Sequence, residues 1–254
     1  MAGMAEVYEL APELPRPELP GDVIVRRSPG EVADAVAADL FLQAQNCVRA
    51  FGDFHLALSG GQSPLPVYHA LMLDPAYRAL PWKRTHLWVV HEPGRGPSAC
   101  ELIEELIVTH GDVPREQFHP MEAKESDFDG AVAGYERQMR EHLGWREPGH
   151  DRFDFVLLGL GEDGSTAGYG IESLSHDGDS ALVRPSESTG GLTLTLRSIN
   201  AARLIAVVAT GEAKRAGIKL AMKRGQFMDT PIGRINPVGG RLRWYLDEAA
   251  CPLE

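Results

Sequence analysis

The chain has 254 residues, 43% of them hydrophobic, and a net charge of −11 with neutral histidines. This length suits a single α/β domain, and the lack of an apolar run of about eighteen residues argues against an integral membrane protein. The negative charge argues against a general nucleic-acid binder, which needs a basic face to neutralise phosphates. Any anionic ligand must therefore be bound by local groups.

Residues 1–22 are expected to be a flexible lead-in, because they are rich in Pro and Glu and lack the basic and apolar stretches of a secretory signal. We expect one domain over residues 23–254. The cysteines are odd in number and widely spaced, which predicts neither a disulfide framework nor a zinc-ligand pattern: Cys47, Cys100 and Cys251. A cytoplasmic protein with reduced thiols is expected.

The first predicted elements are a strand over 23–27 and a long helix after it. Ser28 and Glu31 have the spacing of a capping box, and Pro29 lies at a first-turn position. Apolar residues then recur every three or four positions, which places them on one face of the helix.

Short apolar runs alternate with helical patterns along the rest of the chain. The runs cover residues 55–61, 85–92, 151–161, 191–196, 203–211 and 242–250, and the helical patterns cover 63–73, 98–110, 128–143 and 211–225. Such alternation is typical of an α/β fold with a mostly parallel sheet covered on both faces. The turn-rich segment 170–191 is expected to be a loop, either a lid or a surface excursion.

A glycine-rich turn follows the second predicted strand. In the stretch from Ser59 to Ser63, Gly60 and Gly61 allow several backbone N–H groups to point to one place, while Gln62 and Ser63 offer side-chain donors. The helix that follows adds partial positive charge at its start. This pattern predicts a phosphate cradle, with a tight turn that binds nothing as the alternative.

Lys214 lies in the first turn of a later predicted helix. A cation there opposes the helix dipole unless an anion is close. We therefore consider Lys214 a candidate phosphate partner, the alternative being a solvated surface lysine.

Three stretches together resemble the 6-phosphogluconolactonases, which are similar in turn to the glucosamine-6-phosphate isomerase/deaminase group. Residues 56–71, LALSGGQSPLPVYHAL, resemble the family's phosphate loop, and residues 153–168, FDFVLLGLGEDGSTAG, resemble its motif ending in Asp-Gly-His-Thr-Ala-Ser. Residues 192–218 and 239–250 match the C-terminal portion of the family. The similarity extends from about residue 23 to residue 250.

The resemblance implies a Rossmann-like three-layer α/β/α domain that hydrolyses 6-phosphoglucono-δ-lactone to 6-phosphogluconate in the pentose phosphate pathway. It implies a sugar phosphate as the partner and no metal or organic cofactor. A δ-lactone is an activated ester, so the protein has only to hold the phosphate, deliver a water molecule and offset charge on the carbonyl oxygen.

The sequence departs from the family's pattern at the expected chemistry. Ser165 occupies the position of the histidine that the family is expected to use as general base. The family's Asp-Glu-Arg after the third strand reads His91, Glu92 and Pro93, and its Ser-Asn-Tyr segment reads Ser-Ala-Cys at 98–100.

Several readings fit these departures. In a rebuilt site, His91 is the base, Glu92 or Asp163 orients it, and Arg95 reaches the phosphate. A Ser165 nucleophile activated by His91 is a further possibility. Alternatively, the chain is a catalytically impaired relative that binds a sugar phosphate, or an aminosugar-phosphate isomerase or deaminase. The structural alternatives are a cap or surface role for His91 and a turn role for Asp163.

The other histidines are scattered along the sequence without paired ligand spacing, so a metal site is not expected; they include His55, His69, His86, His110 and His119. Trp88 and Trp244 fall in strand patterns and are expected in the core. A monomer or small homo-oligomer is expected.

Overall fold

The structure is a computed structural model that describes residues 13–122, 127–144, 152–171, 180–222 and 230–252. Its centre is a seven-stranded sheet in which every neighbouring pair of strands is parallel. The order is β1-β10-β9-β6-β2-β3-β5. The strands are β1 (Asp22–Arg26), β2 (Phe54–Leu58), β3 (Thr85–Val89), β5 (Phe118–His119), β6 (Phe155–Gly159), β9 (Leu204–Ala209) and β10 (Arg241–Asp247).

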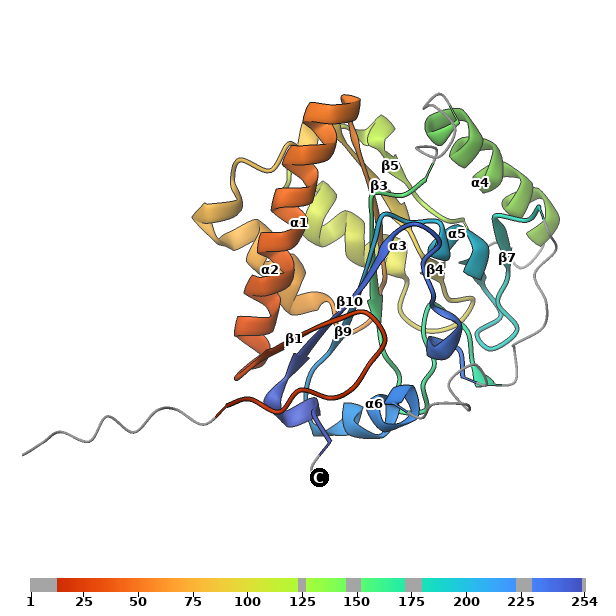
Figure 1. Ribbon diagram of the computed structural model, residues 1–254. Coiled ribbons are helices and arrows are strands. Elements are labelled where there is room, and N and C mark those ends of the chain that lie inside the picture. The colour runs from red at the N-terminus through yellow and green to blue at the C-terminus, as the bar shows by residue number, and fades with distance from the viewer. Residues whose placement is uncertain (1–12, 123–126, 145–151, 172–179, 223–229, 253–254) are drawn as a thin grey trace, which may run out of the picture.

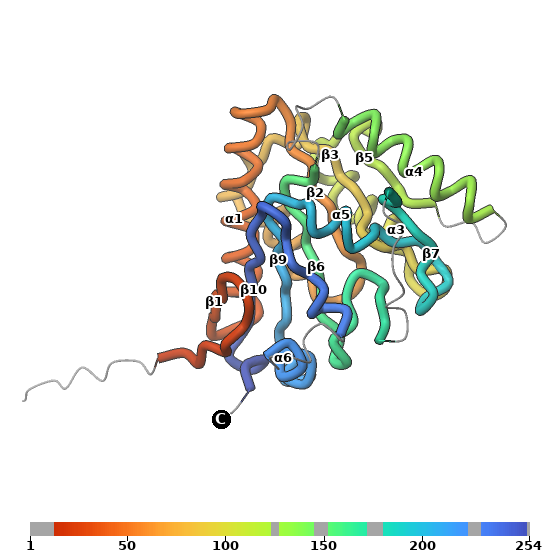
Figure 2. Tube along the Cα trace, turned by 45° about the vertical axis from the view of Figure 1, so that its right-hand side comes forward, coloured from red at the N-terminus to blue at the C-terminus, as the bar shows by residue number. Residues whose placement is uncertain are grey.

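Helices cover both faces of this sheet. Figure 1 shows α1 and α2 on one side and α4 and α5 on the other, with α6 at one end of the strands. The turned view in Figure 2 keeps the same arrangement. The helices are α1 (Pro29–Phe51), α2 (Leu65–Leu73), α3 (Ala99–Ile103), α4 (Phe128–Leu143), α5 (Leu196–Asn200) and α6 (Arg215–Met222). The predicted three-layer α/β fold is confirmed.

Shorter helical segments connect these elements. A π-helical turn, Glu104–Val108, continues α3. The short 3-10 segments are Pro75–Tyr77, Trp82–Arg84, Arg115–Gln117, Glu212–Lys214, Ile232–Arg234 and Glu248–Ala250.

The start of α1 follows from its local sequence. The Ser28 side chain accepts from the backbone N–H of Glu31 at 3.2 Å, and Pro29 is the first helical residue. The Glu31 carboxylate accepts from the N–H of Arg27 at 3.0 Å. The predicted cap is therefore confirmed. In a standard capping box the Glu31 carboxylate would accept from the N–H of Ser28, whereas here it accepts from the N–H of the preceding residue, Arg27.

The expected lead-in lies partly outside the described residues. Within the described part, the carbonyl of Pro20 accepts from the Trp244 indole at 2.8 Å. Trp244 and Trp88 are fully buried, as predicted. Among the described residues, no helix combines the length and apolar character needed to cross a membrane.

A second sheet corrects one sequence expectation. Residues 170–191 were expected to be a loop, but Val183–Pro185 forms β7, which pairs antiparallel with β8 (Leu192–Leu194). β8 pairs in turn with the two-residue strand β4 (His91–Glu92). Turn-forming residues on both sides hide this short strand in the sequence. The small sheet holds His91 beside the ends of the main strands.

The histidines that are scattered in sequence are gathered in space, which corrects a second expectation. His55, His86 and His119 stack between the sheet and α4, with the rings of His55 and His86 4.7 Å apart, and the His142 ring packs at a tilt against His119, 4.6 Å away. Burial lowers the pKa of His119 to about 3. Strand register brings these residues together, and linear spacing does not reveal register.

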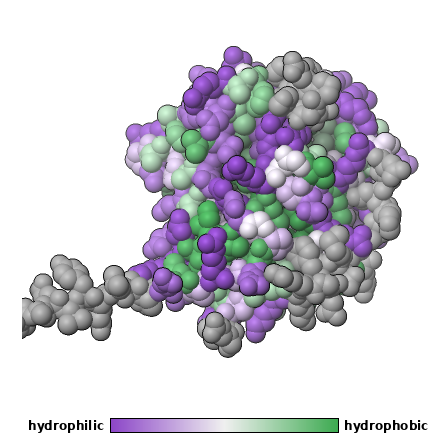
Figure 3. All heavy atoms as spheres, viewed as in Figure 1, coloured by the Kyte–Doolittle hydropathy of each residue, from purple (hydrophilic) through white to green (hydrophobic). Residues whose placement is uncertain are grey.

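Hydrophilic residues cover the outer parts of the face in Figure 3, while hydrophobic residues gather toward its middle.

The three cysteines are free thiols in the structure: Cys47, Cys100 and Cys251.

Candidate active site

A cleft of about 720 Å³ opens at the carboxyl ends of β2, β3 and β6. Ligands bind at this end of open parallel sheets, because the loops leading into helices converge there. Three segments line most of the cleft: the glycine turn 59–63, the segment starting at His91, and the loop 159–170. The volume lies in the range of small-molecule sites.

The glycine turn forms one wall of the cleft, and all five of its residues line it: Ser59, Gly60, Gly61, Gln62 and Ser63. Gly60 packs so closely on α3 that an added Cβ would lie 2.6 Å from the Ala99 Cβ. Gly61 has φ +85°, which favours glycine. α2 begins two residues after the turn, but Pro64 and Pro66 have no N–H and the Leu65 N–H donates to the Gln62 carbonyl, so the amides of the turn itself are the backbone donors that a ligand could use.

The Ser59 hydroxyl is the clearest sign of a ligand in this wall. Ser59 is 8% exposed, and its Oγ is buried without a hydrogen-bond partner, although the residue lines the cleft. Its carbonyl is held by the Tyr68 hydroxyl at 2.5 Å. A buried hydroxyl without a partner costs about 1–3 kcal/mol, which a bound acceptor or donor would recover.

His91 forms the opposite wall, and its tautomer follows from a chain of hydroxyls. The Gly168 carbonyl can only accept, so Ser186 donates to it at 2.7 Å. Ser186 then accepts from Thr189 at 2.9 Å, and Thr189 accepts from His91 Nε2 at 2.8 Å. The proton of the neutral ring is therefore on Nε2 and the lone pair on Nδ1.

The electrostatic environment keeps this imidazole neutral near pH 7. Burial lowers the pKa of His91 from its usual value to about 4. The ring is thus in its basic form over the whole neutral range, although it is a weaker base than a solvated histidine.

Two departures from the family's pattern fit one another in space. His91 stands where the resemblance places aspartate, and Gly168 stands where it places serine. Gly168 has φ +73°, and a Cβ there would overlap the His91 ring at Cδ2. The imidazole therefore fills the space that a side chain at position 168 would need.

Asp163 and Ser165 shape the loop after β6. Asp163 accepts from the Ser165 N–H at 3.0 Å, which is an Asx-type turn. Hydrogen bonding from the Ser165 side chain is the main cause that lowers the Asp163 pKa, and the charge of Lys214 adds to it. Both Asp163 and Ser165 line the cleft. A Cβ added at Gly217 would overlap the Gly161 carbonyl oxygen, so α6 packs closely against this loop.

Three other predicted site residues do not line the cleft. Glu92 is 8% exposed and accepts from the Cys100 N–H at 2.8 Å, so it caps the start of α3. Arg95 is exposed. Lys214 lies near Asp163, and its positive charge contributes to lowering the pKa of that carboxyl group. No lysine or arginine is among the described lining residues, which include the carboxylates of Glu101, Glu105 and Asp163, so backbone amides and hydroxyls are the donors that the lining offers to an anion.

Sequence reasoning missed the hydroxyl chain. Ser188 and Thr189 line the cleft, and Ser188 also donates to the Gly168 carbonyl. They lie in the segment expected to be a lid or a surface excursion. The sequence feature that could have revealed them is the Ser-Glu-Ser-Thr-Gly-Gly run at 186–191. Unless the pairing of β7 and β8 is known, this run looks like an ordinary turn.

Comparison with known sequences supports the resemblance. The chain is 33% identical over 231 residues to the human GDH/6PGL endoplasmic bifunctional protein, covering 85% of this chain but only 28% of that protein. It is 30% identical over 207 residues to 6-phosphogluconolactonase of a Synechocystis species, covering 78% of this chain and 84% of that enzyme.

Solved structures share the fold. A 6-phosphogluconolactonase from Thermotoga maritima has a TM-score of 0.70 at 21% identity, over 89% of this chain and 99% of that one. A monomeric glucosamine-6-phosphate deaminase has a TM-score of 0.70 at 17% identity, over 90% of this chain and 98% of that one. The fold alone therefore does not separate the two activities.

The family model described as glucosamine-6-phosphate isomerases/6-phosphogluconolactonase matches residues 27–244. These residues include the glycine turn, His91 and the loop after β6. The chain belongs to the glucosamine-6-phosphate isomerase/6-phosphogluconolactonase family.

Proposed function

We propose that this chain hydrolyses 6-phosphoglucono-δ-lactone to 6-phosphogluconate. Relatives named 6-phosphogluconolactonase support this activity, among them one that the chain covers over 84% of its length. The observation that carries the proposal is the position of a neutral histidine, His91, in the same cleft as the glycine turn.

The glycine turn is proposed to hold the phosphate. The backbone amides around Gly60 and Gly61 and the hydroxyls of Ser59 and Ser63 supply hydrogen-bond donors, and the dipole of α2 adds partial positive charge. Lys214 adds a full charge from the rim. This arrangement suits a dianion without requiring a basic surface, in keeping with the net charge of −11.

His91 is proposed to act as the general base. Its Nδ1 takes a proton from water as the oxygen adds to the lactone carbonyl carbon, while Nε2–H stays bonded to Thr189. The ring C–O bond then breaks, and the leaving alkoxide takes the proton back from Nδ1. One water is consumed and one acid is formed, with no net proton stored on the protein.

Asp163 and Ser165 are proposed to position the loop that faces the reacting carbon. The Ser165 side chain is bonded to the Asp163 carboxylate, whose lowered pKa makes it a weak proton acceptor, so we assign this pair to holding the loop and not to nucleophilic attack. Glu92 is proposed to position α3 through its bond to Cys100. For Arg95, a phosphate contact stays a prediction.

The direct test is hydrolysis of freshly prepared lactone at mildly acidic pH, where the uncatalysed reaction is slow. Glucono-δ-lactone without a phosphate is the matched control substrate. We expect saturable hydrolysis of the phosphorylated lactone and a much lower kcat/KM for the control. A rate equal to buffer for both substrates would contradict the proposal, and equal rates above buffer would contradict the phosphate cradle.

A cytoplasmic location stays a prediction. Three free thiols support a reducing compartment, although the human relative is named endoplasmic. The prediction of a monomer or small homo-oligomer also stays open to measurement of the mass in solution.

A further inference from the structure

A group of histidines lies at the opposite end of the sheet from the cleft. His86 is the second residue of β3, His119 ends β5, and His142 lies in the last turn of α4. One nitrogen from each ring lies within 4.8 Å of the other two. We propose that His86, His119 and His142 bind a divalent transition-metal cation of the Zn²⁺ type.

The spacing is close to that of a metal site. His86 Nδ1 and His119 Nε2 are 3.0 Å apart. Two nitrogens bound to a tetrahedral Zn²⁺, each about 2.0–2.1 Å from the metal, lie roughly 3.3 Å apart. A small opening of the His86–His119 pair therefore admits the ion, and a turn of the half-buried His142 side chain completes three ligands.

The His119 ring is already oriented to ligate. His119 Nδ1 lies 3.2 Å from Gln138 Oε1, and since that oxygen only accepts, the ring proton is on Nδ1. The Nε2 lone pair then faces His86. Metal-bound histidines are commonly fixed in this way, by donating their second N–H to a carbonyl or carboxylate.

His86 supplies the proton that a cation would replace. In the metal-free protein, His86 Nδ1–H donates to the His119 lone pair. On metal binding, that proton moves to Nε2 of the same ring, which leaves Nδ1 free to ligate and releases no proton overall. The three ligands are then neutral imidazoles, which suit Zn²⁺ and similar cations.

His55 belongs to the surroundings of this site. The Trp88 indole N–H donates to His55 Nδ1 at 3.1 Å, so the His55 proton is on Nε2, 3.3 Å from the Asp53 carboxylate. Ligand atoms of Asp53, His55 and His86 also lie within 4.8 Å of one another. Asp53 thus places a negative charge beside His86, which helps to offset a cation.

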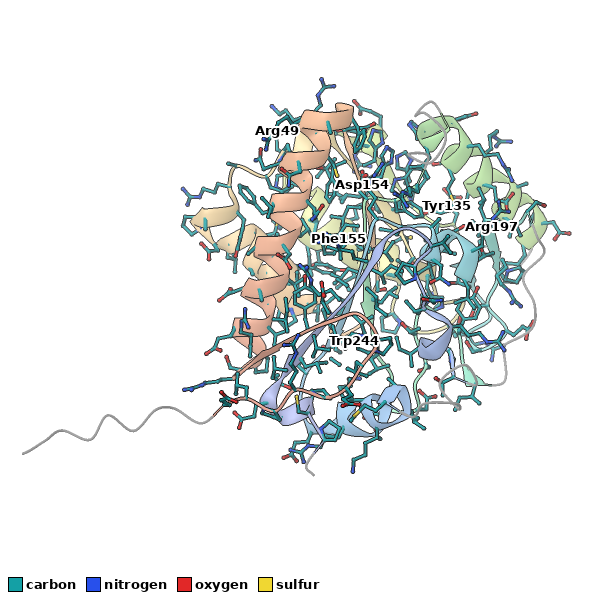
Figure 4. All side chains as sticks on the ribbon, viewed as in Figure 1. Arg49, Tyr135, Asp154, Phe155, Arg197 and Trp244 are labelled. Carbon is teal, nitrogen blue, oxygen red and sulfur yellow. The ribbon has the colours of Figure 1, made fainter. Side chains whose placement is uncertain are left out.

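The site is separate from the catalytic cleft. His91 lies five positions after His86, roughly 16 Å along an extended chain. Figure 4 labels Asp154 and Tyr135, which flank the histidine group: Asp154 accepts from the His55 N–H, and the Tyr135 ring packs edge-on against Trp88. The cation would join β3, β5 and α4, so its expected effect is on stability.

The test uses the full chain without a histidine tag, stripped with a chelator and titrated with ZnCl₂ by calorimetry and thermal unfolding. We expect one Zn²⁺ per chain and a Tm that rises with the Zn²⁺ concentration. His142→Gln, at a half-buried helix position, should weaken binding at least tenfold, and Gln138→Leu should weaken it about tenfold.

His69→Gln is the matched control, because His69 is exposed on α2 and outside the group. It should bind Zn²⁺ like the wild type. Lack of saturable binding to the wild type, or equal binding to wild type and His142→Gln, would overturn the proposal. If His142→Gln fails to fold, the Gln138→Leu titration decides, since an unchanged affinity there would also overturn it.

Discussion

The two ends of the sheet carry polar groups of different origin. At the carboxyl ends of β2, β3 and β6, the cleft is built from loops, and backbone amides, hydroxyls and one imidazole face an open volume. Toward the amino ends of β2 and β3, the rings of His55 and His86 stack, the rings of Trp88 and His119 stack beside them, and His142 of α4 packs at a tilt against His119. The first arrangement suits a reacting organic ligand, and the second suits at most a single ion.

The difference shows how each kind of site is encoded. The cleft depends on short contiguous stretches, in which a glycine turn and the helix after it form one unit. The histidine group depends on register: His55 pairs with His86, and Trp88 pairs with His119. A shift of one strand by one residue would disperse it.

The largest expected effect concerns the fit of His91 against Gly168. Gly168→Ala adds strain of about 1–3 kcal/mol at φ +73° and pushes a methyl group into the imidazole. We expect lactone hydrolysis to fall about 100-fold, as for loss of a general base. Kinetics and chemical denaturation check this.

Gly52→Ala is the control for that change. Gly52 has φ +91° and no atom within 4 Å of an added Cβ, so it carries the same backbone strain away from the cleft. Its hydrolysis rate should equal that of the wild type. If both variants lose activity equally, strain and not displacement of His91 is responsible.

The Ser59 hydroxyl should act on the ligand and not on the fold. Because its Oγ has no partner in the free protein, Ser59→Ala should leave the free energy of unfolding unchanged or slightly higher. KM should rise about tenfold through loss of a hydrogen bond to a charged group. Steady-state kinetics and thermal unfolding measure the two effects.

Ser28→Ala provides the opposite pattern. It removes the α1 cap and should cost about 1 kcal/mol of stability without changing KM. A Ser59→Ala variant that loses stability while keeping its KM would show that the Ser59 hydroxyl does not contact the substrate.

Lys214 should have a smaller effect, because it acts from the rim. We expect Lys214→Gln to raise KM about threefold and to leave kcat nearly unchanged, with the difference shrinking as salt is added. Lys219→Gln, exposed on the next turn, is the matched control and should change neither constant. If the two variants raise KM equally, the effect comes from the change in net charge and not from the position of Lys214.

The last expected effect concerns the pH dependence of stability and activity. The folded pKa of His91 is about 4, below its unfolded value, so the unfolded chain binds more protons between pH 6.5 and 4. His91 therefore makes the free energy of unfolding fall as the pH decreases through this window, and His91→Gln should flatten the slope. As the pH is lowered, kcat should fall with a midpoint near pH 4, where His91 becomes protonated. A midpoint near pH 6.5 would contradict a buried His91.

Much of the fold was predictable from local pattern. The first strand was expected at 23–27 and lies at Asp22–Arg26, and the Ser28 cap starts α1. Buried apolar strands alternating with helices specify a parallel sheet, because each strand must be covered on both faces. The glycine turn was predictable for the same reason, since its geometry is local.

The missed features all depend on contacts across the chain. β7 is recognisable only through its pairing with β8. The tautomer of His91 depends on Thr189, almost a hundred residues later. Likewise, Gly168 reads as a turn residue until the His91 ring is seen against it.

The central claim is that His91, and not the residue at position 165, is the base for lactone hydrolysis. The most direct measurement compares kcat for His91→Ala and Ser165→Ala with the phosphorylated lactone, both variants being checked for the wild-type fold. We expect a loss of about 100-fold or more for His91→Ala and less than about tenfold for Ser165→Ala. Retained activity in His91→Ala, with a large loss in Ser165→Ala, would contradict it.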